Sequence, residues 1–175
     1  MYCTIINSTA LVYCMLFLLT SCNSAEHRVQ SKAYDLMLQT LLTDSIPSVS
    51  VDSLAQKQNR VILLDTRSQP EYEVSHIDGA RFVGYESFDR TAVQDISKDT
   101  AIITYCSVGY RSEKITKRLR EMGFTNVKNL YGGIFEWKNQ GHTVVNDTGV
   151  TEKIHAYNKL WGQWLNINSG QKVYQ

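Results

Sequence analysis

From Pro47 to Gly141, short apolar runs alternate with more polar segments. Five of these runs have the length and composition of β-strands. We place the strands at 49–51, 61–64, 80–83, 101–105 and 127–130. The run at 61–64 is apolar at every position, which is typical of a strand buried on both faces of a parallel sheet. Strands that alternate with short helices predict an α/β domain with a mostly parallel sheet.

The segments between the expected strands carry helix signals. Ser68 can cap a short helix at 69–74. A longer helix is expected at 112–122, where Gly123 can close it, and another at 134–139. Ligands of such sheets bind at the carboxyl ends of the strands, so the loops that follow the strands should converge on one site.

The predicted domain covers residues 47–145 and has a further segment on each side. Residues 22–46 are polar at first, and we expect a tether in which 33–42 could form a short amphipathic helix. Residues 146–175 form a C-terminal extension that is rich in aromatic side chains. Apolar residues recur in it at helical spacing, which predicts a helical tail that packs on the domain. These residues are Ile154, Tyr157, Leu160, Trp161, Trp164 and Leu165.

The first 21 residues contain no charged side chain, and residues 10–19 form an apolar run. The run is too short to span a bilayer but has the length of a signal-peptide core. The sequence Leu19-Thr20-Ser21-Cys22 resembles the lipobox of bacterial lipoproteins, in which cleavage leaves a lipidated cysteine. The resemblance predicts a lipoprotein signal peptide at 1–21 and a lipid anchor on Cys22. The protein would then sit on a membrane of the bacterial cell envelope, facing the periplasm or the cell exterior. An ordinary signal peptide cut near Cys22 is the alternative.

Composition agrees with a globular protein, since 43% of the residues are hydrophobic and 20% are charged. The net charge of +1 gives no argument for a nucleic-acid partner. The four cysteines are at positions 3, 14, 22 and 106. With the signal removed and Cys22 lipidated, Cys106 would be the sole thiol and could form no internal disulfide. A free cysteine in an extracytoplasmic protein suggests chemistry.

Cys106 lies where an expected strand ends and a helix begins. Backbone N–H groups at a helix N-terminus are unpaired and carry the positive end of the helix dipole, so they favour a thiolate or the anion that it attacks. Gly109 lies inside the turn and Arg111 closes it, as an anion-binding turn requires. A buried structural cysteine is the plainer alternative.

Two other loops should reach the same edge of the sheet. Asp65 and Arg67 follow the strand at 61–64, and Gly132-Gly133 follows the strand at 127–130. A charged pair at the end of a strand is usually structural, so we expect Asp65 and Arg67 to brace the loops beneath the site.

Three motifs, in this order, resemble the signatures of single-domain rhodaneses. The first comprises 64–67, 71–72 and 76–80, the second is the C-x-x-G-x-R loop at 106–111, and the third is 129–134 with Trp137. The resemblance covers about residues 47–145 and implies a five-stranded, mostly parallel sheet flanked by helices.

The resemblance also implies sulfurtransferase activity of the thiosulfate sulfurtransferase class. The thiolate of Cys106 would attack the outer sulfur of a donor such as thiosulfate or a persulfide, and the Cys106 persulfide would pass that sulfur to a thiol or to cyanide. The partners would be a small sulfur donor and a thiol acceptor, and no cofactor is implied.

The active-site loop that binds the substrate would comprise Ser107, Val108, Gly109, Tyr110 and Arg111. Gly109 permits the backbone to curl around the sulfur. Arg111 would either contact an oxyanion donor or brace the loop through a carboxylate or carbonyl.

Two other functions stay open. Cysteine-dependent phosphatases and arsenate reductases use a similar loop with five residues between cysteine and arginine, whereas four separate Cys106 from Arg111. The shorter loop favours a sulfur atom over a tetrahedral phosphate. Rhodanese domains also act as binding or redox-sensing modules, although inactive copies usually lack the cysteine that this chain has. His27, His142 and His155 show no metal-ligand spacing, so no metal is expected.

Overall fold

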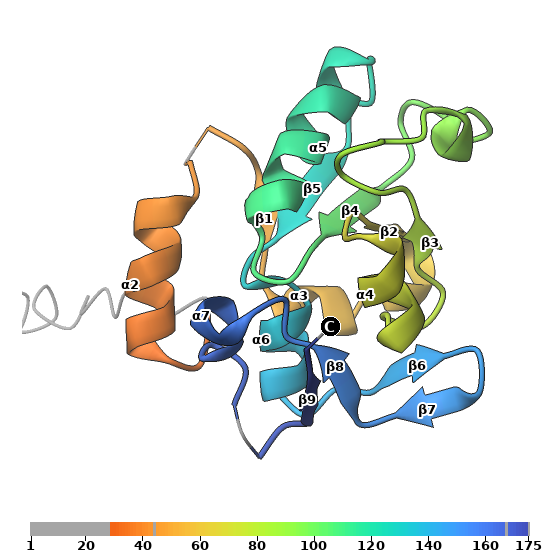
Figure 1. Cartoon of the computed structure of the whole chain (residues 1–175). Coiled ribbons are helices and arrows are strands. Elements are labelled where there is room, and N and C mark those ends of the chain that lie inside the picture. The colour runs from red at the N-terminus through yellow and green to blue at the C-terminus, as the bar shows by residue number, and fades with distance from the viewer. Residues whose placement is uncertain (1–28, 44, 167, 175) are drawn as a thin grey trace, which may run out of the picture.

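The computed structural model describes residues 29–43, 45–166 and 168–174. The signal peptide expected at 1–21 and the lipidation expected at Cys22 lie outside the described residues. The centre of the domain is a five-stranded sheet, in which all neighbouring strands are parallel and the strand order is β1-β5-β4-β2-β3 (Figure 1). The strands are β1 (Ser48–Val49), β2 (Ile62–Asp65), β3 (Arg81–Phe82), β4 (Ile102–Tyr105) and β5 (Val127–Leu130). The predicted α/β fold is therefore confirmed.

Helices cover both faces of this sheet. They are α2 (Lys32–Leu41), α3 (Val51–Ala55), α4 (Gln69–Val74), α5 (Tyr110–Glu121), α6 (Gly133–Asn139) and α7 (Lys159–Gly162), with the short 3-10 helices η1 (Gln58–Arg60) and η2 (Thr91–Val93). No helix in the described part of the chain is long and apolar enough to cross a bilayer.

Successive side chains of β2 and β4 enter different cores, because neighbouring residues of a strand point to opposite faces. Leu63 and Ile103 belong to the buried cluster that also contains residues of α2, α3 and α6. Leu64 and Ile102 belong to a second cluster, which α5 covers. This two-sided burial explains why the strand at 61–64 is apolar at every position.

The helix starts follow the sequence signals closely. The Ser68 N–H and hydroxyl both donate to the Glu71 carboxylate at the start of α4, at 3.0 and 2.8 Å. Among the helices of the described residues, α5 is the longest, and it begins at Tyr110, two residues before the expected start at 112. Gly109 takes the N-cap position with a left-handed φ of 115°, so the helix starts directly behind the cysteine loop.

The described part of the expected tether is instead packed on the domain. Tyr34 and Leu38 of α2 are fully buried. Burial of each stabilises the fold by about 1.5–3 kcal/mol. The Tyr34 hydroxyl donates to the Gly132 carbonyl at 2.8 Å, and the Thr43 N–H donates to the Glu113 carboxylate of α5 at 2.9 Å. The expectation of a tether is therefore corrected for residues 29–43, whose apolar face closes one side of the core.

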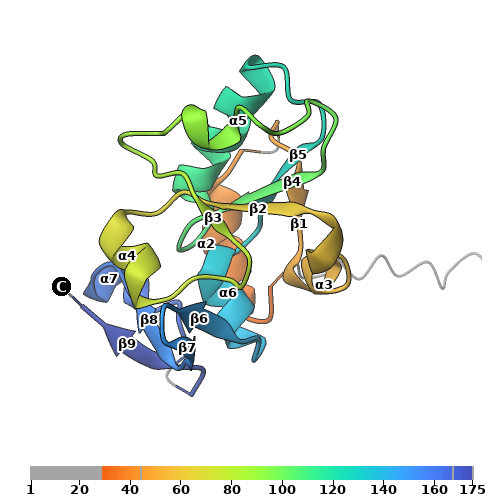
Figure 2. The ribbon, with the colours of Figure 1, turned by 90° about the vertical axis from the view of Figure 1, so that its right-hand side faces the viewer.

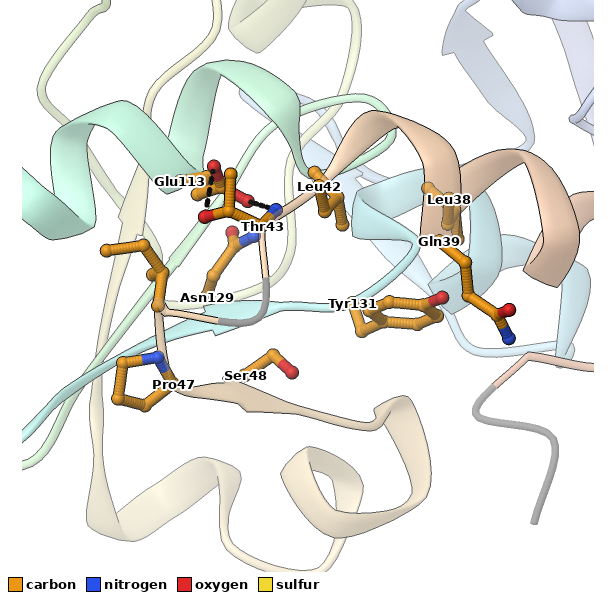
Figure 3. A pocket seen from close by; sticks show the side chains of 10 residues that line it. Leu38, Gln39, Leu42, Thr43, Pro47, Ser48, Glu113, Asn129 and Tyr131 are labelled. Atoms are coloured by element: carbon orange, nitrogen blue, oxygen red, sulfur yellow. Dashed lines mark hydrogen bonds between the residues drawn. The ribbon is translucent and has the colours of Figure 1, made fainter. Parts of the chain in front are cut away.

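Figure 3 shows where this segment meets the sheet. Thr43 bonds to Glu113 above a pocket of about 140 Å³, which Leu38, Asn129 and Tyr131 help to line. This pocket lies on the α2 side of the cysteine loop, and the thiol is not part of its wall.

The C-terminal extension also differs from the expected helical tail. It contains β8 (Lys153–His155), the single turn of α7, and β9 (Gln171–Val173), which pairs with β8 in parallel. It begins within a hairpin of β6 (Val144–Asn146) and β7 (Gly149–Thr151). Tyr157 has a left-handed φ of 65° and Asn158 is extended, so no helix can run through both. The expected packing on the domain is present, since β8 lies against α4 and the extension gathers beside α4 and α6 in both views (Figures 1 and 2).

Candidate active site

Cys106 directly follows β4 and begins the loop that ends at Arg111, in the first turn of α5. Its Sγ accepts a hydrogen bond from the Gly109 N–H at 3.2 Å. Only 1% of Cys106 is exposed, although it lines a pocket that opens to solvent. The structure therefore places the thiol at the positive end of a twelve-residue helix, as the sequence predicts.

The carbonyls of the loop are tied to the first turn of α6. The Ile134 N–H donates to the Cys106 carbonyl at 2.9 Å, and the Phe135 N–H donates to the Ser107 carbonyl at 3.1 Å. In a planar trans peptide the C=O and the next N–H point in opposite directions, so the N–H groups of Ser107 and Val108 point away from α6. The loop thus presents N–H groups on the side opposite α6, which suits an anion.

Gly133 makes this close approach possible. A Cβ at position 133 would lie 2.4 Å from the Cys106 carbonyl oxygen and 2.6 Å from that of Ser107. No side chain is compatible with such distances, so α6 can dock on the loop only through a glycine. The third sequence motif therefore supports the cysteine loop from below.

The Gly109 carbonyl is fixed as well. The Asn129 side-chain amide donates to it at 3.0 Å, and the Ser112 hydroxyl lies 3.1 Å from it and 2.7 Å from the Asn129 Oδ1. These contacts hold the Gly109 peptide in the left-handed conformation that aims its N–H at the sulfur.

Arg111 is held by Glu71 of α4. Its two terminal nitrogens donate to the two carboxylate oxygens at 2.7 and 2.6 Å, and one of them also donates to the Ser107 hydroxyl at 3.0 Å. The Ser107 hydroxyl in turn donates to Glu71 at 3.0 Å. Of the two roles expected for Arg111, the structure shows the bracing one, because both ends of its guanidinium fork are engaged by a carboxylate.

The electrostatics of the pair agree with its geometry. Burial by itself would raise the pKa of Glu71, but the hydrogen bonds and charge of Arg111 lower it to about 2. Burial by itself would lower the pKa of Arg111, but the hydrogen bonds to Glu71 and the charge of Cys106 raise it above its ordinary value. The guanidinium therefore stays charged beside the sulfur.

Asp65 and Arg67 form a second ion pair, fully buried, beneath the site. The Arg67 side chain donates to the Asp65 carboxylate at distances from 2.6 to 3.1 Å and to the Ser75 carbonyl at 2.6 Å. Neither residue lines the pocket over Cys106, so the geometry agrees with the expected bracing role.

A pocket of about 280 Å³ opens above the sulfur. Cys106 lies in its wall together with four of the five expected loop residues, Ser107, Val108, Tyr110 and Arg111, whereas Gly109 lies behind them. The other walls come from two distant segments. They contribute Tyr85, Glu86, Tyr157 and Trp161.

Three functional candidates were missed by sequence reasoning. Glu71 lies three residues after Ser68, and this spacing signals a capping box, but nothing in the sequence pairs it with an arginine 40 positions away. Helical spacing places Tyr157 and Trp161 in a packing helix, whereas their position in the pocket depends on the turn after β8. Within the described residues, no group of His, Cys, Asp or Glu is arranged to hold a metal ion.

Comparison with known proteins agrees with the fold. The family model of the rhodanese-like domain matches residues 50–140. A solved rhodanese-like domain from Anabaena sp. aligns with a TM-score of 0.53 at 25% identity, over 57% of this chain and 79% of that domain.

Among curated proteins, the adenylyltransferase and sulfurtransferase UBA4 of Candida albicans is 30% identical over 93 residues, which are 49% of this chain and 21% of that protein. The tRNA uridine(34) hydroxylase of Pectobacterium carotovorum subsp. carotovorum is 36% identical over 84 residues, 45% of this chain and 24% of that protein. The chain thus matches only about a fifth to a quarter of the length of these relatives. The family model matches more than half of the residues of this chain, which therefore belongs to the rhodanese-like domain family.

Proposed function

We propose that this protein is a sulfurtransferase that carries a sulfane sulfur as a persulfide of Cys106. The observation that carries the proposal is the hydrogen bond from the Gly109 N–H to Sγ at 3.2 Å, in a loop whose Cys106 and Ser107 carbonyls are turned toward α6. The name of the Candida albicans relative, which includes sulfurtransferase activity, supports the same chemistry.

The reaction has two displacement steps. The Cys106 thiolate attacks the outer sulfur of a donor such as thiosulfate, the S–S bond breaks, and sulfite leaves with the bonding electron pair. An acceptor thiolate or cyanide then attacks the outer sulfur of the Cys106 persulfide, and the Cys106 thiolate leaves. Gly109 donates to the sulfur that attacks the donor, and the loop N–H groups and the Arg111 charge favour an anion in both steps.

The geometry disfavours phosphate chemistry. A phosphatase loop needs an arginine whose guanidinium is free to grip the phosphoryl oxygens. Here both terminal nitrogens of Arg111 are bonded to Glu71, and the loop is one residue shorter than that of a cysteine-dependent phosphatase.

Mass spectrometry of the intact protein after incubation with thiosulfate tests the proposal. The wild type should gain one sulfur atom, Cys106→Ala should gain none, and cyanide should remove the sulfur as thiocyanate. If the wild type gains no sulfur from thiosulfate, mercaptopyruvate, glutathione persulfide or polysulfide, the protein is a binding or redox-sensing module instead.

We also propose that the domain is anchored to the bacterial cell envelope through a lipid on Cys22, so that it faces the periplasm or the cell exterior. The lipobox-like sequence before Cys22 supports this location. Membrane fractionation of Cys22→Ala tests it.

A further inference from the structure

One wall of the pocket above Cys106 is built by residues outside the segment that matches the family model. The match ends at residue 140, whereas Tyr157 and Trp161 belong to the C-terminal extension. The side chains of these two residues line the pocket together with Tyr85 and with residues of the cysteine loop. The extension therefore changes the surface that a substrate meets, without changing the reactive loop.

The backbone holds Tyr157 in place at a conformational cost. Its φ of 65° is left-handed, and among the described residues it is the one non-glycine residue with a positive φ. This backbone conformation is strained for a residue that has a Cβ, and such strain persists only where the surrounding structure holds the backbone in place. The Tyr157 N–H donates to Nδ1 of the buried His155 at 3.1 Å, which fixes the turn.

The same turn sets the position of the two rings. The Arg111 guanidinium carbon lies 5.1 Å from the centre of the Tyr157 ring, so this ring covers the arginine. Asn158 caps α7 by accepting the Trp161 N–H at 3.0 Å, which places Trp161 one turn further along the pocket wall. Nearly half of Tyr157, 47%, is exposed, so its ring has a free surface for a ligand.

The charges around the pocket do not favour a small dianion. Among the described residues that line the pocket, Arg111 is the one cation, and its guanidinium is already bonded to Glu71 and covered by Tyr157. Glu86 adds a negative charge to the same wall. Thiosulfate would therefore find N–H groups at the sulfur but no free cation, whereas an apolar group would find several aromatic rings.

We infer that Tyr157 and Trp161 determine specificity, and that they select a sulfur carrier with an apolar or aromatic body over inorganic thiosulfate. This inference rests on the proposed sulfurtransferase function. The carrier presents a terminal sulfane sulfur to Cys106 while its body packs between the rings of the extension and those of the loop side.

Thiosulfonates provide matched probes of this selection. The Cys106 thiolate attacks their terminal sulfur, the S–S bond breaks, and a sulfinate leaves with the electron pair, so the chemistry parallels that with thiosulfate. Benzenethiosulfonate and methanethiosulfonate carry the same single negative charge and differ in the body alone. Thiosulfate carries two negative charges and has no organic body.

The experiment measures kcat/KM for sulfur transfer from each donor to cyanide. In the wild type we expect benzenethiosulfonate to exceed methanethiosulfonate by about tenfold, since each aromatic contact contributes a factor of about two to ten. Tyr157→Asn and Trp161→Leu should each lower this ratio by about three- to tenfold. Asparagine tolerates the left-handed conformation, so Tyr157→Asn removes the ring and retains the turn. Leu160→Ala is the matched control, because Leu160 is 67% exposed, neighbours Trp161 and does not line the pocket.

The outcomes separate the two proposals. Transfer from all three donors with an unchanged ratio in both pocket variants, or a wild-type preference for thiosulfate, overturns the specificity inference and leaves the sulfurtransferase proposal intact. A wild type that accepts sulfur from none of the donors overturns both. Circular dichroism of Trp161→Leu shows whether the half-buried Trp161 side chain is needed for folding. If it is, the donor ratio of Tyr157→Asn alone tests the specificity inference.

Discussion

The pairing of Arg111 with Glu71 makes a quantitative prediction for Glu71→Gln. Glutamine has the shape of glutamate but no charge, so the variant leaves the Arg111 guanidinium facing a neutral group. The Glu71 side chain is 2% exposed and that of Arg111 is 17% exposed, so water can compensate only in part. The carboxylate accepts hydrogen bonds from Ser68, Ser107 and Arg111, and the substitution weakens all of them.

Two independent arguments give the size of the effect. A native pKa of about 2, against an ordinary value of 4.5, corresponds to about 3 kcal/mol of stability at neutral pH. Removal of one partner from a buried ion pair costs about 3–5 kcal/mol, and the partial exposure of Arg111 puts this pair at the lower end. We therefore expect Glu71→Gln to lower the free energy of unfolding by about 3 kcal/mol, which for a chain of this size lowers Tm by roughly 6–12 °C.

The pH dependence distinguishes this mechanism from a simple packing defect. The native pKa of Glu71 is below its unfolded value, so the unfolded state binds more protons between pH 4.5 and about 2. The stability that Glu71 contributes is complete above pH 4.5 and is lost as the pH falls toward 2. The gap in stability between wild type and Glu71→Gln should therefore shrink over that interval.

Urea unfolding at a series of pH values measures the gap directly. Glu73→Gln is the matched control, because Glu73 lies on the same helix, is exposed and accepts a hydrogen bond from Gln69 of the same helix. A gap that stays constant from pH 7 to pH 2.5, or an equal loss in Glu73→Gln, would refute the assignment of the stability to the ion pair.

Three other substitutions probe the parts around the loop. Gly133→Ala should abolish sulfur loading and lower the free energy of unfolding by more than about 2 kcal/mol, because its Cβ would meet the carbonyl oxygens of Cys106 and Ser107. Gly141→Ala is the control, since a Cβ there meets nothing within 4 Å; it should cost about 1 kcal/mol and keep full sulfur loading. Burial lowers the native pKa of His155 from 6.5, so the stability that neutral His155 contributes is complete above pH 6.5 and is lost as the pH falls below it. In His155→Gln the free energy of unfolding should therefore change less between pH 6.5 and 5 than in the wild type. Equal slopes of unfolding free energy against pH in the two proteins would contradict this. Cys22→Ala should move the protein from the membrane fraction to the soluble fraction, and unchanged fractionation on an immunoblot would exclude lipid anchoring at this position.

The sequence predicted the parts of this molecule that depend on local patterns. The apolar runs at 61–64 and 101–105 became β2 and β4 because both faces of each strand are buried. The loop at 106–111 was recognisable because a left-handed glycine and a helix start leave a signature in consecutive residues. The pair of Arg111 with Glu71 left no such signature, since it joins positions that only the folded sheet brings together.

The errors at the two ends have a common physical cause. Periodicity reports which residues are buried but not the partner against which they are buried, so the apolar face of α2 did not predict its docking on Gly132. In the extension, apolar residues at helical spacing also fit a strand followed by a turn and a short helix. The left-handed backbone of Tyr157 rules out a continuous helix, and tyrosine has no preference for the left-handed conformation from which the sequence could predict it.

The site therefore has parts of two kinds, which can vary independently. The residues that hold and polarise the sulfur all lie within the segment matched by the family model: the loop from Cys106 to Arg111, Glu71, and the first turn of α6. The surface facing the sulfur includes Tyr157 and Trp161, which the extension supplies from outside that segment. A substitution in the first group should change the rate with every donor, because each residue there acts on the loop itself. A substitution in the second should change the ranking of donors, because those rings line the space in which we infer that the body of the substrate packs.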